Sequence, residues 1–403
     1  MVHRKLYFRL LTHLDKKEFS IITGARQTGK STLLRQLEMN CKEQEIPAIF
    51  INLENKLLVA DLNQSPLNLL RYLPETEKRI VVLIDEVQYL ENPSNFLKLL
   101  YDEYAGKIKI VATGSSAFYI DTRFRDSLAG RKRLFHLHTC SFDEYLAIAG
   151  EEVLLEEFKV IGSQPGYKSL KIDLLRMEWE KYMIYGGYPA VAAEKDANEK
   201  VALLKEIRDS FIKRDIIESG VQNEMAFYKL FGLLAAQTGN LVNVNELAAT
   251  LQIKNETVVS YLNIMQKCFH IALIRPYFKN LRKELTKMQK VYIPDSGLRN
   301  CLLNNFQYIT ERADRGELWE NVVFRLIVEN NEVDEIHFWR TSAGNEVDFV
   351  LPAHQIPLAV EAKLNASLIS KSKYKLFTET YPGLPLKFLV LNPVDENFFR
   401  NLP

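Results

Sequence analysis

The chain has 403 residues, of which 47% are hydrophobic and 26% charged, and its formal net charge at pH 7 is +1. A single hydrophobic core rarely supports so many residues, so we expect two or three domains. The small net charge excludes a protein that coats nucleic acid through a global basic excess. No apolar run approaches the roughly 18 residues of a membrane span, and the N-terminal residues lack a secretory signal. The composition therefore predicts a cytoplasmic protein that does not enter a membrane.

A glycine-rich segment at residues 24–31 carries the strongest functional signal. Its sequence, GARQTGKS, follows the apolar run 19–22 and precedes a helical pattern. The spacing fits G-x-x-x-x-G-K-[ST], in which backbone N–H groups of the turn and of the helix N-terminus bind phosphates. The residues that we expect to contact the nucleotide are Gly24, Ala25, Arg26, Gln27, Thr28, Gly29, Lys30, Ser31 and Thr32.

Four of these residues have specific expected roles. The Lys30 ammonium can reach the β- and γ-phosphates, and the Ser31 hydroxyl can bind Mg²⁺. Gly24 and Gly29 let the backbone close around the phosphates where a Cβ would obstruct it. The segment therefore predicts ATP or ADP as the ligand and Mg²⁺ as the metal.

The run Ile80–Glu86 supplies the carboxylates that such a site needs. Its β-branched residues predict a buried parallel strand, and ligands collect at the carboxyl ends of such strands. Asp85 is then expected to bind the Mg²⁺ that Ser31 also binds, and Glu86 to position or polarise the attacking water. Adjacent carboxylates in these roles predict hydrolysis of the nucleotide rather than its storage.

A third strand, Lys107–Thr113, also ends in small polar residues, so Thr113 or Ser115 can contact the γ-phosphate or the water. Together, the phosphate loop, the acidic strand and this polar strand resemble the core of AAA-type P-loop ATPases. With LAGR (128–131) and YGGYP (185–189), nearly the whole chain resembles prokaryotic AAA ATPases whose C-terminal half is a domain of unknown function. The resemblance implies an ATPase.

In ATPases of this type an arginine from the same chain or from a neighbour completes the charge of the transition state. Arg131 in LAGR is the matching candidate, and Arg123 and Arg125 compete with it. An arginine supplied by a neighbour implies self-association into a homo-oligomer.

We predict an α/β fold with three domains, the first of which carries a helical lid. An ATPase core with a parallel sheet spans 1–138, and a helical lid spans 139–205. A winged-helix-like domain spans 206–290, and a nuclease-like α/β domain spans 291–403. The presumptive recognition helix of the winged helix is poor in basic residues, which favours a scaffold over a DNA reader. The most basic and aromatic stretch, 275–287, can nevertheless meet phosphates.

A second set of chemically suggestive residues lies near the C-terminus. Glu361 and Lys363 share one face of a predicted strand, and Asp348 on the preceding strand can point to the same place. The helical Glu320, or Glu317 one turn earlier, can complete the set.

This order of residues resembles PD-(D/E)xK nucleases, with Val347 in place of the proline. The resemblance implies that Asp348 and Glu361 bind Mg²⁺, with Glu320 as a further ligand, and that Lys363 activates water. A solvated ion pair between Glu361 and Lys363, and a nuclease-like fold without cleavage, both stay open.

The sequence thus predicts a Mg²⁺-dependent ATPase coupled to DNA binding or processing through its C-terminal domain. The alternative is an ATP-controlled protein-interaction switch with a catalytically inactive nuclease-like fold. A small-molecule kinase requires an acceptor pocket and a set of lid arginines, and we identify neither in the sequence.

Overall fold

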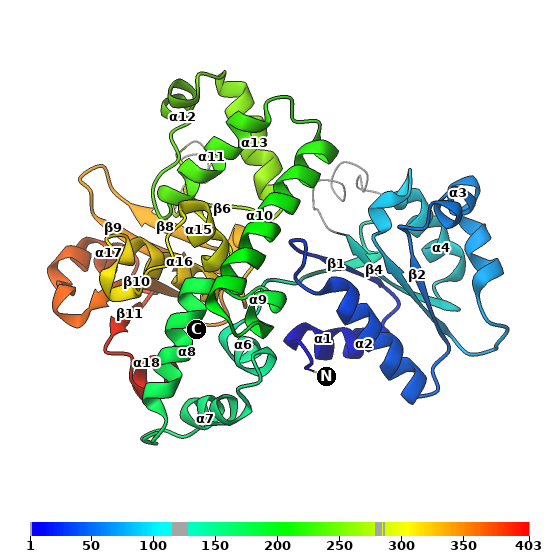
Figure 1. The fold of residues 1–403 in the computed structure, drawn as a ribbon, viewed down its shortest axis with the longest axis horizontal. Coiled ribbons are helices and arrows are strands. Elements are labelled where there is room, and N and C mark those ends of the chain that lie inside the picture. The colour runs from blue at the N-terminus through cyan, green and yellow to red at the C-terminus, as the bar shows by residue number, and fades with distance from the viewer. Residues whose placement is uncertain (1, 115–127, 279–283, 285–286, 403) are drawn as a thin grey trace. The chain divides into compact units, whose positions relative to one another are not determined.

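The computed structural model describes residues 2–114, 128–278, 284 and 287–402 (Figure 1). These residues form two compact units. Unit 1 comprises residues 1–138 and 267–269, and unit 2 comprises 139–266 and 270–403. Among the helices that the structure describes, none is both long enough and apolar enough to cross a membrane.

Unit 1 contains a parallel five-stranded sheet in the order β2-β3-β4-β1-β5. Its strands are β1 (Phe19–Thr23), β2 (Ala48–Asn52), β3 (Ile80–Asp85), β4 (Ile108–Gly114) and β5 (Lys132–His136). Its helices are α1 (Lys5–Leu14), α2 (Lys30–Glu43), α3 (Lys56–Gln64) and α4 (Pro93–Tyr104), with the 3₁₀ turns η1 (Pro66–Tyr72) and η2 (Val87–Tyr89).

The alternation of side chains along β3 shows why this sheet is covered on both faces. Val81 and Leu83 pack in one buried cluster with residues of α1 and α2. Val82 and Ile84 pack in another, with residues of α3 and α4. A strand with two apolar faces needs a helical layer on each side, as the predicted parallel arrangement requires.

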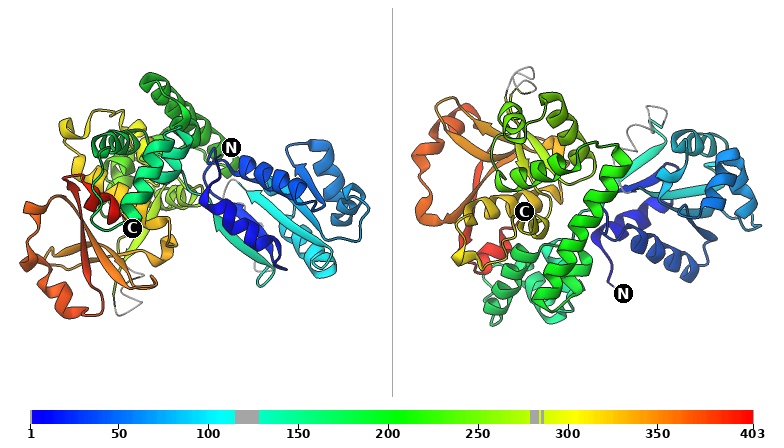
Figure 2. Two further views of the ribbon diagram at one scale, coloured as in Figure 1. Left: turned by 90° about the horizontal axis from the view of Figure 1, so that it is seen from below. Right: turned by 45° about the horizontal axis from the view of Figure 1, so that its top comes forward.

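Unit 2 is built around a mixed six-stranded sheet in the order β11-β10-β9-β8-β6-β7 (Figure 2). Its strands are β6 (Ala272–Pro276), β7 (Lys290–Tyr292), β8 (His337–Arg340), β9 (Glu346–Leu351), β10 (Leu358–Asn365) and β11 (Leu386–Asn392). The helices before β6 are α6 (Phe142–Ile148), α7 (Glu152–Ser163), α8 (Ile172–Tyr185), α9 (Pro189–Ala193), α10 (Ala197–Ser219), α11 (Glu224–Ala236), α12 (Val244–Leu251) and α13 (Asn255–Lys267). The later helices are α15 (Ser296–Leu303), α16 (Arg315–Val328), α17 (Lys375–Thr380) and α18 (Glu396–Arg400).

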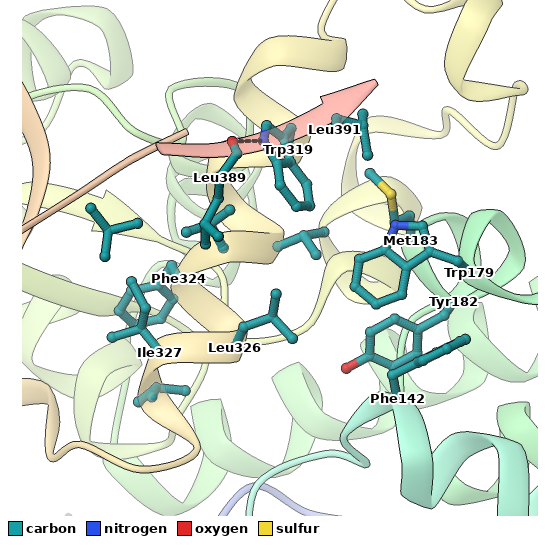
Figure 3. Close-up of a cluster of buried hydrophobic side chains, with 14 of the residues drawn as sticks. Phe142, Trp179, Tyr182, Met183, Trp319, Phe324, Leu326, Ile327, Leu389 and Leu391 are labelled. Carbon is teal, nitrogen blue, oxygen red and sulfur yellow. Dashed lines mark hydrogen bonds between the residues drawn. The ribbon is translucent and has the colours of Figure 1, made fainter. Parts of the chain in front are cut away.

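The helices of the predicted lid share one core with the C-terminal part of the chain. Phe142 of α6 and Trp179 of α8 lie in the same buried cluster as Trp319 of α16 and Leu389 of β11 (Figure 3). The Trp319 indole N–H donates to the Leu389 carbonyl at 3.1 Å. Segment 139–205 is therefore helical as expected, but its apolar side chains are buried within unit 2. It does not form a separate lid domain.

The segment predicted as a winged helix contains three helices, α11–α13, followed by the antiparallel pair β6–β7. Both strands belong to the six-stranded sheet, and β7 crosses the predicted domain boundary at 290/291. A boundary there would divide a hydrogen-bonded sheet, so the two predicted C-terminal domains are continuous. The identification as a winged helix stays a prediction, and residues 279–283 and 285–286 of the basic stretch lie outside the described residues.

Candidate functional site

The phosphate-loop residues 24–29 connect the end of β1 to the start of α2. Gly24 has a φ of 151°, and a Cβ built on it would lie 2.2 Å from the Leu137 carbonyl oxygen. Gly29 is the N-cap of α2 and has a left-handed φ of 95°. Both positions therefore require glycine, one because of a close backbone approach and the other because of its conformation.

Polar side chains hold this loop closed. The Lys30 ammonium donates to the carbonyls of Gly24 at 2.9 Å and Ala25 at 2.7 Å. The Thr28 hydroxyl donates to the Ala25 carbonyl at 2.8 Å. Ser31 and Thr32 are exposed in the first turn of α2, where a phosphate and its metal can reach them.

Arg4, just before α1, contacts the same loop and was not predicted as a site residue. Its guanidinium donates from Nη1 to the Thr28 carbonyl at 3.0 Å and from Nη2 to the His138 carbonyl at 2.9 Å. The residue is 8% exposed. The sequence does not indicate that Arg4 contacts the phosphate loop. Arg4 and Thr28 are 24 positions apart, and no local motif links them.

The acidic strand and the polar strand end beside one another at the same sheet edge as the phosphate loop. β4 lies between β3 and β1, with Ala112 in register with Ile84 and Thr113 with Ile22. The buried Thr113 hydroxyl donates to Asp85 Oδ1 at 2.5 Å and accepts the Glu86 backbone N–H at 3.0 Å. Thr113 therefore fixes the positions of both acidic residues.

Glu86 sits at a turn that directs its side chain away from the strand. Its φ is 60°, a left-handed conformation that is uncommon for a residue with a Cβ. Its carboxylate accepts a hydrogen bond from the Gln88 amide. The donors to Asp85 and Glu86 are thus a hydroxyl and an amide, which carry no net charge.

The chemistry of these groups fits Mg²⁺ with a nucleotide. Oxygen donors suit this small, hard cation, which binds through one or two protein groups together with phosphates and water. Asp85 and Ser31 are the protein groups that could hold it, as predicted. Ser115, Arg123 and Arg125 lie outside the described residues.

Arg131 lies at the opposite edge of the sheet. It immediately precedes β5, whose Lys132 is in register with Phe19, the first residue of β1. The phosphate loop follows the last residue of β1, roughly 16 Å further along a strand of this length. The Arg131 guanidinium binds Asp102 of α4, with Nε–Oδ1 at 2.6 Å and Nη2–Oδ2 at 3.2 Å. Arg131 therefore does not face the phosphate loop of its own chain.

A second polar cluster lies in unit 2, where β9 and β10 separate. Their antiparallel register ends at Phe349 and Val360. The next residue on each strand then binds the backbone of the other. The Asp348 N–H donates to Glu361 Oε2 at 3.1 Å, and the Ala362 N–H donates to Asp348 Oδ2 at 2.9 Å. The two carboxylates are brought together as predicted and replace the missing strand-to-strand bonds.

Lys290 of β7 reaches the same cluster and was not predicted. Its ammonium is 3.1 Å from Glu320 Oε1, 2.5 Å from Glu346 Oε1 and 3.9 Å from Asp348 Oδ1. The Tyr292 hydroxyl also donates to Glu320 Oε1, at 2.6 Å. Glu320 is thus the helical carboxylate that joins the cluster, whereas Glu317 is exposed.

Glu361 has its own charged partner. The Lys363 ammonium donates to Glu361 Oε1, which also accepts the Tyr374 hydroxyl at 2.9 Å. Lys363 is therefore paired, but the ion pair is not the solvated one left open above, since Glu361 is 4% exposed.

Burial and charge shift the proton affinities of this cluster. Burial raises the pKa of Asp348 well above its ordinary value, and the carboxylates of Glu320 and Glu361 raise it further. Burial alone would lower the pKa of Lys290, but the surrounding carboxylates, Glu320 first, raise it overall. A charged ammonium among these carboxylates is thus the favoured state.

The Mg²⁺ implied by the nuclease resemblance does not fit this cluster. Within the part of the chain that the structure describes, no group of three or more His, Cys, Asp or Glu side chains could hold a metal ion. Three carboxylates do surround one point, but the Lys290 ammonium lies among them. The metal-ligand roles predicted for Asp348, Glu361 and Glu320 are therefore not supported by the geometry.

Comparison with known families divides the chain into three parts. Residues 16–146 match a family described as "AAA domain". Residues 176–308 and 315–402 match two families described as "Domain of unknown function", DUF8612 and DUF4143. The N-terminal part is therefore an AAA-type P-loop domain, a fold that supports ATP-dependent activity. The match at 176–308 crosses the predicted boundaries at 205/206 and 290/291.

Similar proteins occur in more than one organism. A Haemophilus influenzae protein is 28% identical over 377 residues, covering 89% of this chain and 88% of its own. The Methanocaldococcus jannaschii protein MJ1637 is 27% identical over 338 residues, covering 77% and 67%. Both are described as uncharacterized, so neither adds an activity.

Solved structures with some similarity include two bacterial proteins. The Thermotoga maritima RuvB Holliday junction branch migration motor has a TM-score of 0.33 at 14% identity, over 67% of this chain and 89% of that one. AMPPCP-bound DnaA from Aquifex aeolicus has a TM-score of 0.30 at 15% identity, over 66% and 89%. Because both TM-scores are below 0.5, we base no conclusion on them.

Proposed function

We propose that this chain is a Mg²⁺-dependent ATPase whose C-terminal part couples hydrolysis to nucleic-acid binding. The observation that carries the ATPase proposal is the pair of bonds that Thr113 makes, to the Asp85 carboxylate and from the Glu86 N–H. These bonds fix the Asp85 carboxylate and the Glu86 backbone at the sheet edge where the phosphate loop begins. Such preorganised groups at the site of reaction are what hydrolysis of a phosphoanhydride requires.

In this proposal each group has one role. The Lys30 ammonium turns from the loop carbonyls to the β- and γ-phosphates and stabilises their negative charge. Ser31 and Asp85 hold Mg²⁺, which neutralises charge on the phosphate oxygens when it is bound. Glu86, oriented by its backbone and by Gln88, accepts a hydrogen bond from the attacking water.

The test compares two lysines of the same helix. Lys30→Ala removes the phosphate-binding ammonium, whereas Lys42→Ala removes an exposed lysine in the last turn of α2. We expect Lys30→Ala to abolish measurable ATP binding and turnover, and Lys42→Ala to retain both. Equal ATP turnover by wild type and Lys30→Ala would refute the proposal.

Self-association belongs to the same proposal, with Arg131 acting on the site of a neighbouring subunit. Its ion pair with Asp102 is partly exposed, with side-chain exposures of 31% and 41%, so solvent screens the attraction and the pair is weak. A neighbour's phosphates can therefore compete for this arginine. We expect turnover per chain to rise with protein concentration in wild type and to stay flat in Arg131→Ala.

Nucleic-acid coupling is supported by the arrangement of unit 2. Asp348, Glu361 and Lys363 adjoin one another on β9 and β10, as the nuclease resemblance implies. Exposed cations flank them: Arg340 on β8, and Lys371 and Lys373 beside Tyr374. Such cations contact phosphates without reading sequence. We assign α11–α13 a scaffold role.

The competing proposal is an ATP-controlled protein-interaction switch with an inactive nuclease-like fold. The internal pairing of Lys290 with the acidic cluster favours it over an active nuclease. The discriminating measurement is the ATPase rate with and without single- and double-stranded DNA, together with nicking in Mg²⁺. DNA stimulation without nicking supports nucleic-acid binding, whereas no effect of either DNA supports the protein switch.

A further inference from the structure

Lys290 is a buried lysine at the centre of an acidic cluster. Its side chain is 1% exposed, and it lies within 4 Å of three carboxylates, those of Glu320, Glu346 and Asp348. Burying an ammonium is costly unless it is paired and hydrogen-bonded. The three carboxylates supply that pairing, and they in turn would repel one another without a cation between them.

Four carboxylate oxygens of this cluster already accept hydrogen bonds. Asp348 Oδ2 accepts from the Ala362 N–H, and Glu361 Oε2 accepts from the Asp348 N–H. Glu361 Oε1 accepts from Lys363 and Tyr374. Glu320 Oε1 accepts from Lys290 and Tyr292. A divalent ion would have to displace several donors at once to gain its usual set of oxygen ligands.

We infer that the Lys290 ammonium is the resident cation of this cluster, that it occupies the place a divalent metal would take, and that the cluster therefore does not support metal-dependent cleavage. The inference deepens the proposed function, on which it rests for the view of unit 2 as the nucleic-acid-binding part. Unit 2 then binds its ligand without cutting it.

The backbone position of Lys290 keeps its ammonium within the acidic cluster. The residue begins β7, and its backbone is held in the sheet by pairing with Ile274 of β6 and by a bridge to Leu241. Its ammonium is therefore tethered, unlike a free ion that exchanges with solvent. Gly239 lies close to the Glu320 carboxylate, and a Cβ built on it would lie 3.0 Å from Oε1.

The test is Mn²⁺ binding by the full-length chain without nucleotide or DNA, followed by electron paramagnetic resonance of the free ion. All proteins carry Asp85→Asn, so that unit 1 lacks the carboxylate proposed to bind Mg²⁺. The variants made in this Asp85→Asn parent are Asp348→Asn, Lys290→Met, Lys290→Met with Asp348→Asn, and Lys200→Met. Lys200 is a matched control because it is buried in the same unit but donates to the Val191 carbonyl.

We expect no Asp348-dependent Mn²⁺ site in the parent or in Lys200→Met. Lys290→Met should gain one site, bound at least about tenfold more tightly than any Mn²⁺ in the parent, because a positive charge has left the carboxylates. Asp348→Asn should remove that site again.

Two results would overturn the inference. One is Mn²⁺ binding by the parent that is lost on Asp348→Asn. The other is a folded Lys290→Met that gains no site. If Lys290→Met does not fold, the parent compared with its Asp348→Asn variant decides alone. These readouts involve no ATP turnover and no DNA, so failure of the proposed ATPase or of DNA binding is detected separately.

Discussion

The two acidic sites of this protein differ in what accompanies their carboxylates. In unit 1, Asp85 and Glu86 accept hydrogen bonds from neutral groups, the Thr113 hydroxyl and the Gln88 amide. In unit 2, the carboxylates of Glu320, Glu346 and Glu361 bind ammonium groups directly. Neutral donors orient a carboxylate and leave its charge for an incoming cation, whereas an ammonium compensates that charge. The type of donor therefore separates carboxylates whose charge is left for the proposed metal from carboxylates that are already neutralised.

The location of the two sites explains the difference. Asp85 is the last residue of β3, at the sheet edge where the phosphate loop also begins. Asp348 lies within β9. Both are buried, at 5% and 8% exposed, so burial does not separate the two sites. At the end of a strand a bound ligand can supply the counter-charge. Within the sheet the protein must supply it, because an unpaired buried charge is strongly unfavourable.

The largest effect is expected from the substitution that removes the internal counter-charge. Lys290→Met should lower the free energy of unfolding of unit 2 by about 3–5 kcal/mol, since it leaves buried carboxylates without their partner. Lys200→Met should cost only about 1 kcal/mol, the value of one hydrogen bond to a carbonyl. Urea unfolding followed by tryptophan fluorescence measures both, because Trp179, Trp319 and Trp339 all lie in unit 2. An unchanged Lys290→Met midpoint would remove the proposed contrast between the two sites.

The next effect concerns the site with neutral donors. Glu86→Gln should reduce ATP turnover by about 10²-fold while ATP affinity changes little, because the amide keeps the shape but loses the basic oxygen. Glu91→Gln, in an exposed position just beyond η2, is the control and should hydrolyse ATP normally. Single-turnover kinetics and nucleotide titration separate the two quantities. Wild-type turnover in Glu86→Gln would mean that another group handles the water.

A further buried polar cluster, around His13 in unit 1, predicts how the stability of that unit depends on pH. His13 Nδ1 lies 2.8 Å from the Ser20 hydroxyl and 3.1 Å from the Lys109 ammonium, so it must act as an acceptor and be neutral. Burial, and next the charge of Lys109, lower the pKa of His13 from 6.5 to about 4. Between these two values the unfolded chain binds a proton that the folded chain does not. Stability should therefore be lost as the pH falls from 6.5 towards 4.

The full shift corresponds to about 3 kcal/mol, and because solvent screens part of the interaction the loss should amount to about 2 kcal/mol in unit 1. Hydrogen exchange of the β1 and β4 amides, corrected for the intrinsic effect of pH, measures it without relying on the tryptophans of unit 2. His13→Gln, which does not titrate, should remove most of the dependence. The same slope in wild type and variant would assign it to other groups.

The smallest effect tests whether Arg4 supports the phosphate loop from outside. Arg4→Met removes the charged donors to the Thr28 and His138 carbonyls and should weaken ATP binding about threefold, with turnover at saturating ATP unchanged. Arg9→Met changes an exposed arginine of α1 and serves as the control. Unaltered affinity in Arg4→Met would limit Arg4 to a structural role.

Local sequence determined the shape of the phosphate loop almost completely. Gly24–Ser31 connects a strand to the helix that directly follows it in the chain. The local sequence is therefore enough to specify the shape of this segment. Asp85 and Thr113 could be assigned to the same place because carboxyl ends of parallel strands share one edge. The fold class followed from the same alternation of strands and helices, and the pairing of Asp348 with Glu361 followed from side-chain alternation along strands.

Tertiary structure decided what surrounds these residues. Arg131 was a plausible partner of the phosphate loop in sequence, but the parallel pairing of β5 with β1 places it at the other edge of the sheet. Residues 139–205 have the amphipathic pattern of helices, yet the pattern does not say which unit buries their apolar faces. Lys290 contacts Glu320, which is 30 positions away in the sequence. The polar residues before Lys290 give no indication that its side chain is buried. Sequence thus specifies contacts made within one element or by a rule of strand order, whereas the counter-charge of a buried carboxylate depends on which distant side chain the packing brings to it.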